Sequence, residues 1–413
     1  MSRLVRLMCL VPAVISAAAV VHSQQASFEE VVGNLRSPEQ KTRVTAVRLL
    51  REAGYKEAIV PIAALVNDPV NAVQLEAIDA ELSFFLVEPV APKKRVVLVG
   101  GGGSEGRALA AFEAGQLAVW PRETPTELAD ALLKALDDDS GKVRAEAIYA
   151  FGTIAAASGK PLSPTAHEGL LKALTHTDVE VRTGAAQVIG RLGIASARDA
   201  LLTAVNDPKA PVRYAAIRAL GQIKDEQSIE AIEKQLLFYE TGDGALAALD
   251  ALALIGHPSA VPIFQAYLMN KDPRLRQTAA EGLARAGNRK LVEPFVMSAN
   301  QDEVESVRAA MTFALHKQGY RNYLSRLIDF MDHPQSAAQV QRYLIELGPE
   351  VVQAVTPRLQ EPDEGVRQHL ATVLGALGNE STLPVLTRLK DDPDTQVASA
   401  AAHAVERIKM TQK

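Results

Sequence analysis

Small and apolar residues recur along most of the chain at the spacing of one helical face. In the clearest copy, an Asn-Asp-Pro turn at 206–208 precedes the segment 212–221, in which Ala216, Ile217 and Leu220 follow Arg213 by three, four and seven residues. Positions with this spacing lie on one side of an α-helix. The pattern predicts a short apolar helix, an Asp-containing turn and a second helix, which together form a helical hairpin.

The hairpin recurs eleven times when Arg213 is taken as the reference position. The equivalent residues are Arg43, Gln74, Arg144, Arg182, Arg213, Ala248, Arg276, Arg308, Val340, Arg367 and Ala398. Most successive spacings are close to 31 residues, but one is 70. One hairpin cannot bury its own apolar face, so the copies must stack on one another. The sequence therefore predicts an all-α fold, an α-solenoid of stacked helical hairpins.

The details of the repeat resemble a known family. The Asp-Pro turn, the Val-Arg pair and the Ala-x-x-Ala-Leu-Gly ending are similar to HEAT repeats, especially the short class found in phycobilin lyase subunits and deoxyhypusine hydroxylase. The resemblance covers about residues 28–408, apart from one insertion. It implies a right-handed, armadillo/HEAT-like superhelix whose second helices line a concave face. It does not specify a function, because one fold supports many.

Asp and Arg residues at fixed places in the repeat predict a structural ladder. An Asp in the turn before a second helix caps free amides and suits the helix dipole. The reference Arg is expected to meet the Asp of its own or the adjacent turn. The predicted ladder consists of Asp139, Arg144, Asp178, Arg182, Asp207, Arg213, Asp272, Arg276, Asp302, Arg308, Asp363 and Arg367. Interruptions are expected at Gln74, Ala248, Val340 and Ala398, and bends of the superhelix near Ala248 and Val340.

The long spacing of 70 residues rather than 31 leaves 39 for an irregular insertion at about 83–124. A strand-like run there leads into four glycines at 100–103, but the Gly-x-x-x-x-Gly-Lys-Ser/Thr pattern of a phosphate loop is missing. A loop with a short helix packed on the solenoid edge, or an imperfect extra repeat, are the interpretations left open. The insertion also holds the single Trp, Trp120, and is a candidate partner contact.

The first 23 residues have the pattern of a secretory signal peptide. Arg3 and Arg6 precede an apolar run at 7–21, and small residues follow. Residues 4–21 also approach the length of a membrane-spanning helix, so an uncleaved anchor stays open. Cleavage would remove Cys9, the single cysteine. The expected organisation is a signal peptide at 1–23, repeats one and two at 24–82, the insertion at 83–124 and repeats three to eleven at 125–410, in a bacterial protein that is periplasmic or secreted.

Charge and candidate chemistry narrow the function classes. Lys and Arg number 44 against 49 Asp and Glu, a formal charge of −5, which gives no general attraction to nucleic acid or to an anionic membrane. Only His167 is directly followed by Glu, as in the metal sites of deoxyhypusine hydroxylase, and there is no cysteine pair or His-Glu-x-x-His run. We therefore expect no catalytic residue, no cofactor and no metal.

Side chains five residues after each reference position are expected to face outward on the concave surface. They mix both charges with aromatic and apolar groups, which suits a protein or peptide better than a nucleic acid. The candidate partner-binding residues are Tyr149, Arg218, Glu281, Phe313 and Trp120. The leading hypothesis is an exported, non-enzymatic scaffold. The alternatives are an enzyme or enzyme accessory of the phycobilin lyase or deoxyhypusine hydroxylase kind, and a membrane-tethered adaptor.

Overall fold

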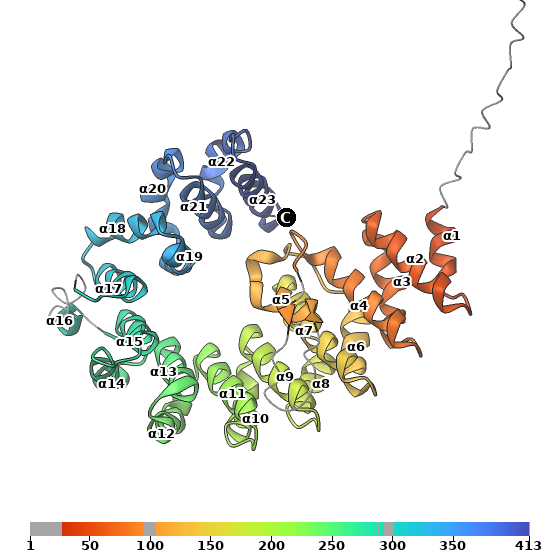
Figure 1. Ribbon diagram of the computed structural model, residues 1–413, viewed down its shortest axis with the longest axis horizontal. Coiled ribbons are helices and arrows are strands. Elements are labelled where there is room, and N and C mark those ends of the chain that lie inside the picture. The colour runs from red at the N-terminus through yellow and green to blue at the C-terminus, as the bar shows by residue number, and fades with distance from the viewer. Residues whose placement is uncertain (1–26, 92, 95–104, 288, 293–300, 413) are drawn as a thin grey trace, which may run out of the picture.

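The computed structural model describes residues 27–91, 93–94, 105–287, 289–292 and 301–412, and these residues form a solenoid of helical hairpins (Figure 1). The predicted all-α solenoid is confirmed. The predicted signal peptide and the glycine run at 100–103 lie outside the described residues. Among the helices of the described ranges, none combines the length and the hydropathy required to span a membrane.

Each hairpin consists of a short first helix and a longer second helix. The first helices are α1 (Phe28–Asn34), α3 (Ile59–Ala63), α6 (Thr126–Lys134), α8 (Pro164–Ala173), α10 (Arg198–Ala204), α12 (Ile229–Tyr239), α14 (Val261–Tyr267), α16 (Arg289–Val292), α18 (Tyr323–Asp329), α20 (Val352–Val355) and α22 (Leu383–Leu389). The second helices are α2 (Gln40–Glu52), α4 (Asn71–Phe85), α7 (Gly141–Ser158), α9 (Val179–Leu192), α11 (Ala210–Gln222), α13 (Gly242–Ile255), α15 (Pro273–Ala286), α17 (Glu305–Lys317), α19 (Pro334–Leu347), α21 (Glu364–Leu377) and α23 (Thr395–Thr411).

Glycine and alanine let neighbouring second helices approach backbone to backbone. A Cβ atom added to Gly221 of α11 would lie 2.5 Å from the Cα of Ala251 in α13. At Gly190 of α9 the corresponding distance, to the Cα of Ala219, is 2.8 Å. Contacts this short exclude any side chain, so the small residues set the distance between repeats. One continuous apolar core results, running from the first repeat to the last.

Arginine side chains link each repeat to the next, as a ladder. Arg182 Nε donates to Asp207 Oδ2 at 2.8 Å, and Arg182 Nη1 donates to the carbonyl oxygens of His176 and Thr177 in its own turn. The same arrangement, with the carboxylate always in the following turn, occurs in the pairs Arg43–Asp68, Arg144–Asp178, Arg276–Asp302 and Arg367–Asp392. Each arginine thus holds its own turn and the next one in register.

Other predicted members of the ladder have different roles. Asp272 and Asp363 accept from main-chain amides and cap α15 and α21. Asp139 offers only its main-chain carbonyl to Arg144. At the two remaining arginines the next turn supplies no carboxylate: Arg213 donates to the hydroxyl of Tyr239, and Arg308 donates to the carbonyls of residues 302 and 303.

The expected interruption at Gln74 is wrong. Gln74 Nε2 donates to Asp138 Oδ2 at 2.7 Å, so an amide replaces the guanidinium. The two residues are 64 positions apart, yet they make the contact that adjacent repeats make elsewhere. The second and third repeats therefore stack directly, and the insertion is looped out of the stack.

Glycines with positive φ mark the end of several second helices and fix the repeat register. Gly193 follows Arg182 by eleven residues and has φ of 66°. Gly256 has the same role at φ 68°, and eleven residues before it stands Ala245, not Ala248. The predicted register of this copy is therefore wrong by three residues. A shift of three is close to one helical turn, so Ala248 is still fully buried and the error left the core pattern intact.

The copy assigned to Val340 has the same error. Gly348, with φ 80°, lies eleven residues after Ala337, which is the correct reference position. The residues five positions further on are then Asp250 and Arg342 in these two copies. Neither Ala245 nor Ala337 can donate to an Asp, so the side-chain ladder is interrupted in both copies, as predicted.

The insertion contains a strand pair and a helix seated on the solenoid. β1 (Lys93–Lys94) pairs antiparallel with β2 (Glu105–Gly106), and α5 (Arg107–Ala114) follows. Phe112 of α5 packs against Tyr149 of α7, with ring centroids 5.5 Å apart. A Cβ atom on Gly152 of α7 would lie 2.8 Å from the Phe112 ring, so this glycine makes room for α5.

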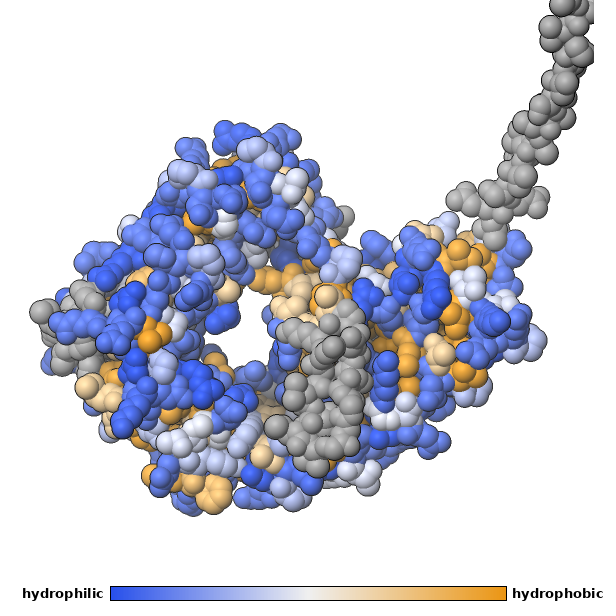
Figure 2. All heavy atoms as spheres, in the orientation of Figure 1, coloured by the Kyte–Doolittle hydropathy of each residue, from blue (hydrophilic) through white to orange (hydrophobic). Residues whose placement is uncertain are grey.

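The solenoid curves until its last helix meets the insertion (Figure 1). Arg407 Nη2 in α23 donates to the carbonyl oxygens of Leu117 and Val119 at 2.9 and 2.6 Å. These partners are 290 and 288 residues away in sequence. The chain is consequently a closed ring with an open centre, visible in Figure 2, and α1 to α3 project beyond it.

Candidate functional site

Long polar side chains of the second helices line the inner wall of the ring. Arg285 Nη2 of α15 donates to Glu346 Oε2 of α19 at 2.7 Å, although α17 lies between these helices. The hydroxyl of Tyr343 in α19 likewise donates to Glu281 of α15. Such contacts past an intervening helix require a sharp inward curve, and they occur in the repeat region where a bend was predicted near Val340. We define the inner row as Arg218, Asp250, Glu281, Arg285, Lys317 and Glu346.

The inner row carries both signs of charge. Burial, reinforced by nearby Glu281, raises the pKa of Asp250 to about 6, and Arg218 lies 4.0 Å away as a weak partner. Burial alone would also raise the pKa of Glu346, but hydrogen bonds from Arg285 and Lys317 lower it. The wall is mostly hydrophilic along α13 to α19 (Figure 2). The lumen can therefore pair with charges of either sign.

Two of the candidate partner-binding residues are buried, so their predicted role is wrong. Tyr149 is 2% exposed because α5 covers it, and Phe313 is fully buried because it stacks on Tyr343 with ring centroids 4.3 Å apart. Arg218 and Glu281 do belong to the inner row. The side chain of Arg218 is 40% exposed, whereas that of Glu281 is 13% exposed and accepts from Tyr343 and Gln277.

The fifth candidate, Trp120, contacts the chain's own last repeat. Its ring meets the imidazole of His403 edge-on at 5.6 Å. Glu88 Oε1 lies 3.7 Å from His403 Nδ1 and accepts from Ser399 Oγ at 3.1 Å. We define the seam as Glu88, Leu117, Val119 and Trp120 of the insertion together with Ser399, His403 and Arg407 of α23.

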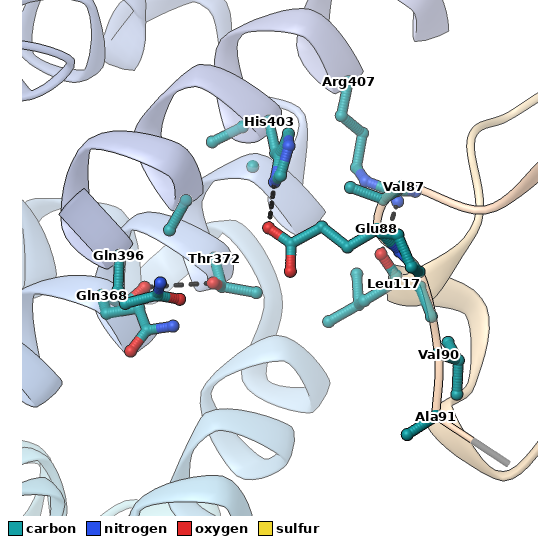
Figure 3. Close-up of a pocket in the computed structure, with 15 residues that line it drawn as sticks. Val87, Glu88, Val90, Ala91, Leu117, Gln368, Thr372, Gln396, His403 and Arg407 are labelled. Atoms are coloured by element: carbon teal, nitrogen blue, oxygen red, sulfur yellow. Dashed lines mark hydrogen bonds and ion pairs between the residues drawn. The ribbon is translucent and has the colours of Figure 1, made fainter. Parts of the chain in front are cut away.

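A cavity of about 460 Å³ lies beside the seam. Figure 3 shows Glu88 extending from the insertion toward His403, while Gln368 of α21 and Gln396 of α23 lie across the cavity from Val90 and Ala91. The residues lining the cavity are thus divided between the insertion and the last two repeats. The two sides meet through Ser399, His403 and Arg407 of α23.

Sequence reasoning missed most of the inner row. Arg285, Lys317 and Glu346 stand nine residues after their reference positions, a place that the prediction did not consider. Asp250 was missed because the register of its copy was shifted. Counting eleven residues back from Gly256 and Gly348 would have corrected the register of these two copies. No comparable sequence signal points to the seam, since its two sides are about 300 residues apart.

The outer surface of the ring carries an exposed apolar group of side chains. Leu237 and Phe238 of α12 are 76% and 75% exposed, and Met269, just after α14, is 86% exposed. These first helices lie on the outer rim in Figure 1. This apolar group is a second candidate binding surface, an alternative to the lumen.

Metal-ligating residues do not gather in the described part of the chain. Within those ranges, no group of three or more His, Cys, Asp or Glu side chains is arranged to hold a metal ion. His167, the one residue of a His-Glu pair, makes a 2.8 Å hydrogen bond with Ser196.

Comparison with known proteins identifies the repeat. The HEAT repeats family matches residues 167–237, 240–316 and 323–406, which is more than half of the chain, and a HEAT-like repeat matches residues 141–192. The chain belongs to the HEAT-repeat family. This assignment agrees with the resemblance that the Asp-Pro turns and Val-Arg pairs carry.

Two characterised proteins are similar to this HEAT-repeat chain over about half its length. It is 30% identical over 182 residues to the bilin biosynthesis protein PecE of Mastigocladus laminosus, covering 42% of the chain and 65% of PecE. It is 23% identical over 208 residues to deoxyhypusine hydroxylase of Drosophila melanogaster, covering 49% of the chain and 66% of that enzyme. The matched regions therefore span slightly less than two thirds of each relative.

Solved structures give more distant matches. An engineered protein is 18% identical, with 92% of this chain and 98% of that one covered and a TM-score of 0.41. The complex of CpcE and CpcF of phycocyanin lyase from Nostoc sp. PCC7120 is 17% identical, with 74% and 100% covered and a TM-score of 0.34.

Proposed function

We propose that this HEAT-repeat protein is an exported, non-catalytic scaffold that binds a protein or peptide segment in the lumen of its ring. The inner row is the observation that carries the proposal. Its positive and negative side chains come from consecutive second helices, so they form an extended polar track and not a single pocket. A polypeptide has both charges along an extended shape, which matches such a track.

The position of the contact can be tested with a photo-reactive amino acid. Placed at Arg218 in the inner row, it is expected to cross-link a polypeptide from a cell-envelope extract. Placed at Lys234, an exposed residue on the outer side of α12, it should give no adduct. An adduct at Lys234 without one at Arg218 would contradict the lumen and favour the outer apolar group of Leu237, Phe238 and Met269.

Export is supported by the pattern of residues 1–23. The expected result is that the mature protein begins at about residue 24, which an intact-mass measurement on protein from its native host would determine. A mature protein that keeps residues 1–23 would favour the membrane-tethered adaptor.

The similarity to PecE and to deoxyhypusine hydroxylase supports a second candidate, an enzyme or enzyme accessory of that kind. Metal analysis of the purified protein separates this candidate from a scaffold. Iron retained in a whole-number ratio after dialysis would contradict the non-catalytic proposal.

A further inference from the structure

The contacts that close the ring differ in kind from those that stack the repeats. Between second helices, small residues bring backbones together and the ladder adds bonds to carboxylates. At the seam, Arg407 donates only to main-chain carbonyls, and the carboxylate of Glu88 remains 59% exposed. The exposed carboxylate of Glu88 exchanges its contacts with water and contributes little to association, so the closure depends mainly on the two hydrogen bonds of Arg407.

The shape of the seam also favours separation. The cavity beside it shows that the insertion and α23 do not fill the space between them. Hydrophobic burial, the main force for association, is absent from the part of this contact that the cavity occupies. Imperfectly packed contacts between parts of one chain commonly permit relative motion.

A solenoid can open such a contact without breaking any repeat interface. Each repeat touches only its neighbours, so a small rotation at every interface adds up to a large displacement at the end. Seven second helices, α9 to α21, connect the two sides of the seam through α7 and α23. Separation of α23 from the insertion thus costs the seam contacts and little else.

We propose that the seam is a reversible closure, and that its opening gives a polypeptide side-on access to the lumen. The access step rests on the proposed function, whereas the opening does not. A closed ring admits a segment only by threading a free end. An opening between α23 and the insertion would also admit an internal segment of a partner whose ends are folded.

The opening of the seam can be measured without any partner by double electron–electron resonance between two nitroxide labels. Nitroxides are placed on Gln116 and Lys409, exposed residues on either side of the seam, in full-length Cys9→Ser protein. The double variant Glu88→Lys/Arg407→Ala is expected to move at least half of a short-distance population to longer distances. Glu123→Lys is the matched control, because Glu123 in the same insertion pairs with Lys160 and not with α23. An unchanged distance distribution in the double variant would overturn the proposal, as would a parent protein without the short distance.

A locked ring tests the access step. The substitutions Glu88→Cys and His403→Cys, joined by a short bis-maleimide linker, would hold the seam shut. The envelope-polypeptide adduct at Arg218 is expected to fall at least fivefold after locking. If the amount of adduct at Arg218 is the same in the linked and the unlinked protein, side-on access is overturned. Failure of both rings to form the adduct counts against the lumen function itself, and the spin-resonance distances still decide whether the seam opens.

Discussion

The contact between α9 and α11 and the contact between α23 and the insertion both join neighbours in the ring, but they are built differently. At α9, a Cβ on Gly190 would come within 2.8 Å of a backbone atom, and Arg182 links the turns through buried bonds. At the seam, polar groups meet around a cavity of about 460 Å³. The contact between α9 and α11 leaves no room for a larger side chain, whereas the seam leaves a cavity unfilled.

The repeat interfaces hold the shape of the solenoid, whereas the seam decides whether the ring is open or closed. Close backbone packing, together with largely buried ion pairs at Arg43, Arg144, Arg182, Arg276 and Arg367, gives the repeat interfaces a well-defined arrangement. The seam lacks both, so the ring can be stable as a solenoid while its closure remains weak. Substitutions on the two sides should consequently have effects of different size and kind.

The largest expected effect comes from the ladder. Arg182→Ala should lower the free energy of unfolding by about 3 kcal/mol, because Asp207 and two turn carbonyls lose their partner in a largely buried place. Urea unfolding followed by circular dichroism measures this loss. The matched control, Lys234→Ala, removes the exposed pair with Glu230 and should leave the free energy of unfolding nearly unchanged. Equal costs would show that the ladder is not structural.

The next effect concerns the backbone contact between repeats. Gly221→Ala should cost about 2 kcal/mol, because its Cβ would lie 2.5 Å from the Cα of Ala251 and the helices must separate. Gly33→Ala is the same change in α1, where nothing lies within 4 Å of the added Cβ, and it should be neutral or stabilising. Thermal unfolding of the two variants compares them directly. A loss of stability in Gly33→Ala equal to that in Gly221→Ala would contradict the packing argument.

The repeated elements were predictable because their signals are local. The 3, 4, 7 spacing after Arg213 defines a helical face, and Asp207 followed by Pro208 marks the turn, so the solenoid follows from short-range pattern alone. Even the shifted register near Ala248 left the core assignment correct, since three residues is almost one turn. What the shift did change was the direction of side chains toward the lumen, and Asp250 was lost from the prediction.

The inner surface and the seam were not predictable, for a physical reason. Whether Phe313 points into solvent or stacks on Tyr343 depends on the local curvature, which accumulates over many interfaces. Trp120 was singled out as a candidate partner contact, but its neighbour in the structure is His403 of the same chain. Sequence spacing contains no information on where the end of a curved solenoid returns.

Replacing Glu81, a buried residue of α4, is expected to have a smaller effect on stability, and one of opposite sign. Glu81 is fully buried, its carboxylate oxygens have no hydrogen-bond partner, and burial raises its pKa well above the usual value. Its protonated form is the one that the fold accommodates. Stability is therefore greatest below the pKa of the unfolded chain, about 4.3, and declines as pH rises from there through the raised pKa of the folded state.

Glu81→Met should remove this decline and stabilise the protein by about 1–2 kcal/mol at neutral pH. Glu81→Gln is the control, because it abolishes the charge but keeps a buried polar group, so it should flatten the pH dependence with a smaller gain. Urea midpoints from pH 5 to pH 8.5 give both slopes. Parent and Met variant with parallel pH profiles would show that Glu81 does not titrate as a buried acid.

The smallest effect on stability is expected at the seam, and it is the sharpest test of the comparison. Glu88→Ala removes the contacts of the Glu88 carboxylate with Ser399 and His403. Because this carboxylate is mostly exposed, the unfolding free energy should change by less than about 0.5 kcal/mol. The double variant Glu88→Lys/Arg407→Ala should nevertheless enlarge the radius of gyration measured by small-angle X-ray scattering, because the ring opens while every repeat stays folded. A loss of stability as large as that of Gly221→Ala, with no change in size, would mean that the seam is packed like a repeat interface. The distinction between a rigid stack and a weak closure would then be wrong.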